Sequence, residues 1–152
     1  MTDLWPNDLG DSALLDVKSP LSILKEQASI LGTKTRMIVK AEVARGNKEF
    51  YLRRDLISEE DFKKFVYEFY IFAPFLDYRY RLFSIIHDID LYPVKFIPDV
   101  EIETEILGVE GVHVGLRADS ESQFMEVLSR ILNSSKAKKV IRSLLAQSTE
   151  IT

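Results

Sequence analysis

Between residues 37 and 117, short segments in which apolar and polar residues alternate follow one another, with turn-forming residues between them. Alternation with a period of two residues predicts strands that bury one face of a sheet. Because consecutive strands usually lie side by side, we expect an antiparallel, meander-like sheet of about six or seven strands. The expected strands are residues 37–43, 49–54, 66–73, 78–87, 91–97, 101–107 and 112–117.

Helical spacing of apolar residues precedes and follows this region. Ser19 and Pro20 suit the cap and the first position of an N-terminal helix, and Gly32 is its expected stop. Two further helices are expected after Ser120, which begins a capping box. The predicted fold class is therefore α+β, with one N-terminal and two C-terminal helices packed on the sheet, in a single domain over residues 18–152.

Two stretches are harder to assign. Residues 45–48, Arg-Gly-Asn-Lys, favour a turn, so the pattern predicts a β-hairpin over residues 37–54. Residues 59–70 fit a helix by the spacing of their phenylalanines and a strand by their aromatic and β-branched content. We expect a short helix over residues 59–65 that leads into the strand at 66–73.

Residues 1–17 have the composition of a flexible acidic tail. The segment contains four aspartates, with leucines and Trp5 between them. Such a mixture cannot build a core of its own, but it can dock into a groove. Trp5, the only tryptophan of the chain, either folds back onto this domain or docks on a partner.

The chain has 152 residues and no cysteine. The lack of cysteine excludes thiol nucleophiles, thiolate zinc sites and disulfides, and it is typical of a reducing cytosol. The N-terminus has neither the positive start nor the apolar core of a secretory signal, and no apolar run approaches the roughly 18 residues of a membrane span. We therefore expect a soluble cytoplasmic protein that has no membrane partner.

The net charge of −4 is unevenly distributed along the chain. Residues 19–57 carry four more basic than acidic side chains, and residues 98–118 carry four more acidic than basic ones. Two such segments can pair with each other or mark two faces, and ordinary solvated surfaces explain them as well. The negative total gives no overall attraction to nucleic acids.

No motif for nucleophilic catalysis or nucleotide binding is present. The chain lacks a Gly-x-Ser-x-Gly elbow, a Walker loop and a Gly-x-Gly-x-x-Gly loop, and no cofactor is expected. His87, Asp88 and Asp90 are candidate metal ligands by type, and His113 or Glu110 would have to complete the site. The alternative is a turn stabilised by aspartate side chains.

A second set of carboxylates comes from the segment at 101–107. Alternation would place Glu101, Glu103 and Glu105 on one face of a strand. Neighbouring carboxylates can raise one another's pKa values, as acid–base catalysis requires. The row is more typical of a solvated strand face or of an edge protected by charge.

Arginines and tyrosines gather on the predicted hairpin and on the strand at 78–87. Regular alternation would place Arg79 and Arg81 on the same side of their strand as Phe83. Both residue types are enriched at hot spots of protein interfaces and also bind single-stranded RNA, although they often serve only in packing. The candidate partner-binding residues are Trp5, Tyr51, Arg53, Arg54, Tyr78, Arg79, Tyr80 and Arg81.

The favoured function is a small non-catalytic binding or adaptor protein, such as a regulator, an inhibitor or a chaperone-like protein, that acts through protein–protein contacts. A homodimer is one option, because a free sheet edge can pair across a two-fold axis. Two alternatives stay open. One is a metal-assisted phosphoester hydrolase that uses His87, Asp88 and Asp90. The other is an RNA-binding module that uses the Arg/Tyr strands.

Overall fold

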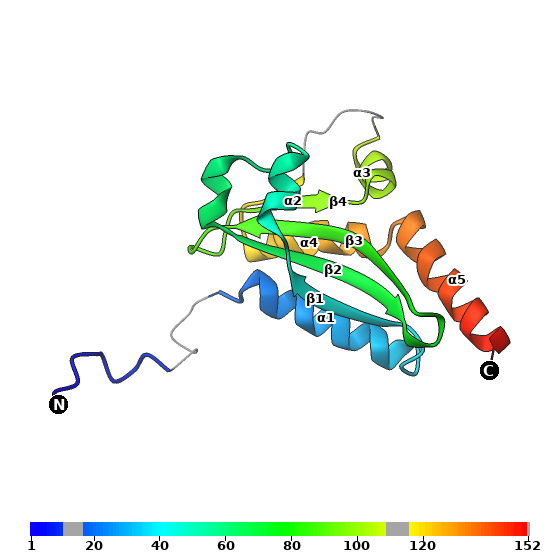
Figure 1. Ribbon diagram of the computed structural model, residues 1–152, viewed down its shortest axis with the longest axis horizontal. Helices are drawn as coiled ribbons and strands as arrows, with labels where there is room; N and C mark the ends of the chain where they lie inside the picture. The colour runs from blue at the N-terminus through cyan, green and yellow to red at the C-terminus, as the bar shows by residue number, and fades with distance from the viewer. Residues whose placement is uncertain (11–16, 109–115, 152) are drawn as a thin grey trace.

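The computed structural model describes residues 1–10, 17–108 and 116–151. Within these ranges the fold is α+β, as expected, with a five-stranded antiparallel sheet whose strand order follows the chain (Figure 1). The meander is confirmed, but the described residues form five strands rather than six or seven. The strands are β1 (Lys40–Arg45), β2 (Phe65–Ala73), β3 (Tyr78–His87), β4 (Val94–Pro98) and β5 (Leu116–Ala118).

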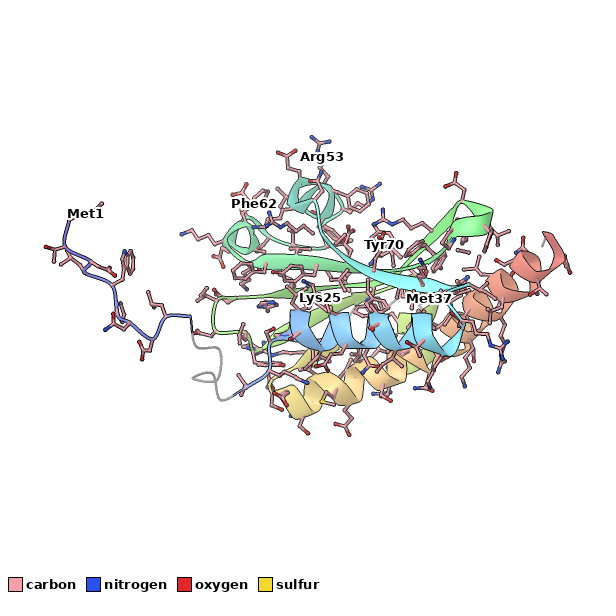
Figure 2. All side chains as sticks on the ribbon, turned by 90° about the horizontal axis from the view of Figure 1, so that it is seen from below. Met1, Lys25, Met37, Arg53, Phe62 and Tyr70 are labelled. Atoms are coloured by element: carbon pink, nitrogen blue, oxygen red, sulfur yellow. The ribbon has the colours of Figure 1, made fainter. Side chains whose placement is uncertain are left out.

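The N-terminal helix and the two C-terminal helices are confirmed. Figure 2 shows α1 and α4 side by side on one side of the sheet, with α2 and Arg53 on the opposite side. No helix in the described ranges combines the length and the apolar character that a bilayer span requires. The helices are α1 (Pro20–Lys34), α2 (Lys48–Arg53), α3 (Val100–Leu107), α4 (Glu121–Leu132) and α5 (Ser135–Ile151), with 3-10 helices η2 (Glu59–Lys63) and η3 (Pro74–Leu76). The expected transition from a short helix to a strand after residue 59 is thus confirmed, although the helix is of the 3-10 type.

The predicted hairpin over residues 37–54 is wrong, because its second arm is the helix α2. The Asn47 side chain accepts hydrogen bonds from the amides of Glu49 and Phe50, which caps the helix. Asparagine is a strong helix cap as well as a turn former, so the turn signal at residue 47 was also a helix start. The helix lays Tyr51 against the sheet and buries it completely.

The predicted strand at 101–107 is also wrong, because the segment is the helix α3. Asp99 caps it by accepting from the amides of Glu101 and Ile102, and Gly108 ends it with φ 70°. Isoleucines four residues apart satisfy a helical stripe as well as an alternation. The three glutamates of this segment therefore do not line one strand face.

Two of those glutamates hold the beginning of α5. The Glu105 carboxylate accepts from the amide of Ser135 at 2.9 and 3.0 Å, and Glu101 lies 3.1 Å from the Lys136 ammonium. A carboxylate is favourable at the positive end of a helix. Two described glutamates of the acidic segment thus pair with the C-terminal helix α5.

The N-terminal helix passes through its expected stop at Gly32 and ends at Lys34. The turn that follows contains two left-handed residues, Arg36 (φ 53°) and Met37 (φ 65°). This conformation is rare for residues with a side chain. The turn reverses the chain so that β1 runs back alongside α1. The helix ends two residues after Gly32, and the left-handed residues that follow it are Arg36 and Met37.

One extra residue in β3 changes the direction of its side chains. The register pairs Phe69 with Phe83 but Tyr70 with Arg81, so Leu82 has no partner on β2. Such a bulge shifts the alternation by one residue. Because paired residues share a face, Arg79 and Arg81 lie on the face opposite Phe83, and the regular alternation expected for residues 78–87 is wrong.

The core lies between the sheet and the helices α1, α3, α4 and α5. A row of aromatic rings crosses it: the ring centroids of Phe69 and Phe83 are 5.1 Å apart, those of Phe83 and Phe96 5.9 Å, and those of Phe96 and Phe124 5.1 Å. Three strands and α4 are thereby joined through contacts of a type that stabilises cores. We call this side of the sheet the helix-covered face, and the other side the open face.

The close approach of Gly46 to β2 yields a stability prediction. A Cβ atom at Gly46 would lie 2.5 Å from Cγ1 of Val66 and 3.2 Å from Cε2 of Tyr51, and both neighbours are buried. We expect Gly46→Ala to lower the free energy of unfolding by about 1–3 kcal/mol, as overpacking does. Urea denaturation measures it. Gly10→Ala is the control, because nothing lies within 4 Å of a Cβ at Gly10; equal midpoints for the two variants would contradict the packing described.

Candidate functional site

Among the residues that the structure describes, the open face is covered only at one end, by α2 and the segment that follows it. There Tyr51 and Ile57 pack on Val66, Ile86 and Ile97 in a second apolar cluster. The rest of the open face carries charged and aromatic side chains from three adjacent strands. These are Lys40 and Glu42 of β1, Glu68, Tyr70 and Phe72 of β2, and Arg79 and Arg81 of β3.

The exposed part of this surface is built around Tyr70, which Figure 2 labels. The Arg79 guanidinium lies 3.6 Å above the Tyr70 ring, and its Nε is 2.6 Å from a carboxylate oxygen of Glu42. The side chains of Arg79 and Glu42 are 49% and 42% exposed. An ion pair this exposed adds little stability. Its effect is to hold the guanidinium in one place at the surface.

A continuous chain of hydrogen bonds runs beneath this layer. The Arg81 guanidinium donates to the Ser84 hydroxyl and to the Ile97 carbonyl, both at 3.0 Å. The hydroxyls of Ser84 and Tyr51 are hydrogen-bonded, and the Tyr51 hydroxyl donates to Glu68. Since Tyr51 has one proton to donate, Ser84 must be the donor toward Tyr51. The chain therefore runs in one direction, from the guanidinium to the carboxylate.

Glu68 is the acceptor at which two phenols meet. Tyr70 donates to it at 3.2 Å, beside the bond from Tyr51. Burial, with the Glu68 carboxylate next in importance, raises the pKa of the Tyr51 phenol far above its ordinary value, and the same two causes raise the pKa of Tyr70. Both phenols therefore stay protonated at neutral pH. They are hydrogen-bond donors and not bases, so this arrangement is suited to recognition and not to proton transfer.

The structure brings together three of the predicted partner-binding residues. Tyr51, Arg79 and Arg81 belong to the open face, with Tyr51 buried at its floor. Arg53 and Arg54 lie at the end of α2 rather than on a strand; Arg53 is 3.9 Å from Glu49. Arg54 lies 3.7 Å above the ring of Phe50, on the border of the open face.

The other three predicted residues lie elsewhere. Tyr80 is on the helix-covered face, where it donates to Asp99, and burial together with that carboxylate raises its pKa to about 12. Tyr78 is exposed and lines a cavity of about 330 Å³ between the start of β3 and α5. The side chain of Trp5 is 74% exposed.

The candidate metal ligands His87 and Asp88 make separate contacts, apart from a hydrogen bond between Nδ1 of His87 and the backbone carbonyl of Asp88 at 2.8 Å. The His87 ring is buried on the helix-covered face against Phe65 and Tyr67, with centroids 5.4 and 5.9 Å away. Asp88 is exposed and accepts from the amide of Ile89. Within the described ranges no group of three or more His, Asp or Glu side chains is arranged to hold a metal ion. His113 and Glu110, which would have completed the site, lie outside the described residues.

Glu42, Glu68, Tyr70 and Ser84 belong to the site but were not among the predicted residues. A signal for two of them was present in the sequence. Glu68 is the one acidic residue in the aromatic run of β2, and Tyr70 shares its face by alternation. Ser84 lies on the same face as Arg79 and Arg81 only because of the bulge at Leu82. The sequence has no glycine or other marker of a bulge at that position.

We compared the chain with protein families, curated proteins and solved structures. No family model matches the chain, and neither a curated protein nor a solved structure matches it significantly. The function must therefore be inferred from the site itself.

The Tyr51 hydroxyl yields the second prediction. Tyr51→Phe leaves Ser84 and Glu68 without their shared partner in a buried place, so we expect the free energy of unfolding to fall by about 1–3 kcal/mol. Tyr78→Phe is the control, because the Tyr78 ring is exposed, and it is expected to change stability by less than about 0.5 kcal/mol. Equal losses in the two variants would show that the hydroxyl chain contributes nothing.

The same residue makes stability depend on alkaline pH. The unfolded chain ionises its phenols near the ordinary pKa of 10.0, whereas folded Tyr51 keeps its proton to higher pH. The stabilisation is therefore complete below pH 10 and is lost as the pH rises through the raised folded pKa. Denaturation at pH 8 to 11 should show a smaller fall in stability for Tyr51→Phe than for the wild type, and parallel curves would contradict this.

His87 yields a prediction at acidic pH. Burial lowers its pKa below the ordinary 6.5, so the unfolded chain takes up a proton that the folded protein does not. Stability should therefore fall as the pH drops below about 6.5. His87→Phe, which keeps a ring against Phe65 and Tyr67, should flatten this fall between pH 7 and 5. The wild type at pH 8 serves as the reference, and identical slopes in urea titrations would show that His87 is not the group responsible.

Proposed function

We propose that this chain is a non-catalytic binding or adaptor protein, and that its open face is the surface on which another protein binds. The proposal rests on one observation: Arg79 is half-exposed and Tyr70 partly exposed at the surface, while Glu42, Glu68 and the hydroxyl chain below hold them in place. Arginine and tyrosine are the residue types that dominate interface hot spots. Side chains that are already ordered lose less entropy when a partner binds.

The border of the open face combines exposed aromatic rings with arginines, as the rim of a protein interface does. Phe50 on α2 is 43% exposed and lies under the Arg54 guanidinium, and Phe62 on η2 is 37% exposed. Apolar rings beside arginines on the same side of the sheet enlarge the surface that a partner can cover. The Tyr51 hydrogen bonds tie α2 to the floor of the open face, so border and floor form one rigid surface.

The RNA-binding alternative has weaker support. Bases stack on aromatic faces that are free, and the Arg79 guanidinium already covers one face of the Tyr70 ring at 3.6 Å. The carboxylates of Glu42 and Glu68 offset the charges of Arg79 and Arg81 on the same surface, which weakens its attraction for a phosphate backbone. The hydrolase alternative also has weaker support, because the His87 ring packs against Phe65 on the helix-covered face while the Asp88 carboxylate accepts from the amide of Ile89.

The test is the capture of a partner with and without Arg79. The wild-type protein is immobilised, and a lysate of its source cells is passed over it at low salt. We expect it to retain a stoichiometric protein partner. The affinity of that partner should be at least about tenfold weaker for Arg79→Ala, as loss of a hot-spot arginine causes. Arg142→Ala, an exposed arginine on α5, is the matched control and should bind as the wild type does.

Two outcomes would contradict the proposal. One is an equal affinity of the partner for wild type and Arg79→Ala, with both variants folded by circular dichroism. The other is an eluate that contains nucleic acid in place of protein and is released steeply by salt, which would favour the RNA-binding alternative.

A further inference from the structure

The strand β1 is a free edge of the sheet. In the strand order of the described residues β1 has β2 on one side and no strand on the other. The opposite edge, β5, has three residues, whereas β1 has six. A long free edge presents unpaired backbone groups on which another strand can form.

The backbone groups that point outward can be assigned. The Gly46 amide donates to the Val66 carbonyl at 2.9 Å, one step beyond the pair Arg45–Tyr67. In an antiparallel ladder, hydrogen-bonded pairs alternate with pairs that are not hydrogen-bonded. Counting back from Gly46 in steps of two, Ala44, Glu42 and Lys40 form hydrogen bonds to β2. The residues between them direct both their amide and their carbonyl groups away from the sheet. The outward-facing residues are Ala41, Val43 and Arg45.

A groove runs beside these outward groups, between β1 and α1. Its volume is about 410 Å³, and its α1 side includes Ala28, Ser29 and Gly32, whose side chains are small or absent, beside Lys25 and Thr33. In Figure 2 Lys25 and Met37 lie along the side of α1 that borders β1. Such a groove has room for the side chains of an added strand.

Met37 makes one end of the groove adaptable. A Cβ atom at Gly32 would lie 3.0 Å from the Met37 sulfur, so the missing side chain leaves room for the thioether. Met37 is 55% exposed and is held there by the two left-handed residues of the turn. Strained backbone of this kind is concentrated at functional positions, and methionine adapts to apolar ligands of different shape.

The charges beside the groove favour an acidic occupant. Among the described residues, Lys25 and Lys40 take part in no ion pair, while the nearby Glu42 is neutralised by Arg79 at 2.6 Å. The groove therefore has two uncompensated positive charges and no free negative one. A second copy of β1 would bring more lysine to this edge, whereas an acidic segment would complement it.

We infer that β1 accepts an extended, acidic segment of a partner protein as a sixth strand of the sheet. This inference rests on the proposed function and adds the class of partner. Alternate side chains of the bound segment enter the groove between β1 and α1, and these are apolar. Side chains of the other set continue the open face beyond Glu42, and acidic residues flank the segment within reach of Lys25 and Lys40.

The test uses a phage-displayed library of random twelve-residue peptides selected on the full-length wild-type protein. We expect enrichment of peptides in which apolar residues alternate, with Asp or Glu beside them and no central proline. Binding of a selected peptide, measured by fluorescence anisotropy, should fall at least about tenfold with Val43→Pro. The Val43 amide points away from β2, so proline removes a docking bond and no bond of the ladder.

A second variant keeps the test decisive if Val43→Pro does not fold. Ser29→Tyr fills the groove from the exposed side of α1, leaves the sequence of β1 unchanged and should cause a similar loss. Arg142→Ala, an exposed arginine on α5, is the control and should leave peptide binding unchanged. In the free protein the amides of Ala41, Val43 and Arg45 should exchange faster than those of their neighbours on β1, and the peptide should protect them.

Three results would overturn the inference. The first is the absence of an alternating acidic pattern among the selected peptides, and the second is peptide binding that neither Val43→Pro nor Ser29→Tyr weakens. The third is a wild-type dimer that Val43→Pro dissociates, because a second copy would then occupy the edge. Each result leaves the Arg79→Ala experiment unaffected, so failure at the edge is distinguishable from failure at the open face.

Discussion

The extra residue at Leu82 is the constraint on which the rest of this structure depends. Side chains of a strand alternate with a period of two, so a strand without the bulge would bury Arg79 and Arg81 beside Phe83 or expose Phe83 and Ile85. Either arrangement places charges in an apolar core or core residues in water, and both are costly. The bulge lets one strand supply aromatic core residues to the helix-covered face and two guanidinium groups to the open face.

The open face and the free edge are parts of one continuous surface. Glu42 belongs to both, since it lies on the edge strand β1 and fixes Arg79 of β3 at the surface. The ion pair therefore has a consequence at the edge as well: it removes the negative charge that would oppose an acidic segment. A partner strand on β1 would present half of its side chains on the open face, beyond Glu42, so the two proposed surfaces can be covered by the same partner.

Elements with a single dominant pattern were predicted correctly. The apolar stripe of α4, the cap at Ser19 and Pro20 and the alternation of β2 each agree with only one structure. The segments α2 and α3 carry two patterns at once, because isoleucines or aromatic residues at short spacing satisfy a strand and a short helix alike. Asn47 and Asp99 cap the free amides at the start of these two segments and thereby favour the helix over the strand. A capping residue stabilises a short helix enough only when the apolar side of that helix also packs on another part of the protein. That packing depends on the tertiary structure.

For this protein the sequence by itself determined the α+β class, the meander order of the strands and the presence of arginine and tyrosine on β3. These follow from local periodicity and from the preference of consecutive strands to pair, and neither needs a distant contact. The tertiary structure alone decided that Tyr51 reaches Glu68 and Ser84, that Glu42 meets Arg79, and that α1 leaves a groove beside the edge of β1. The physical reason is register: a shift of one residue moves a side chain to the opposite face of a sheet, and the register of β3 is set by the packing of its whole core face and not by the residues next to the bulge.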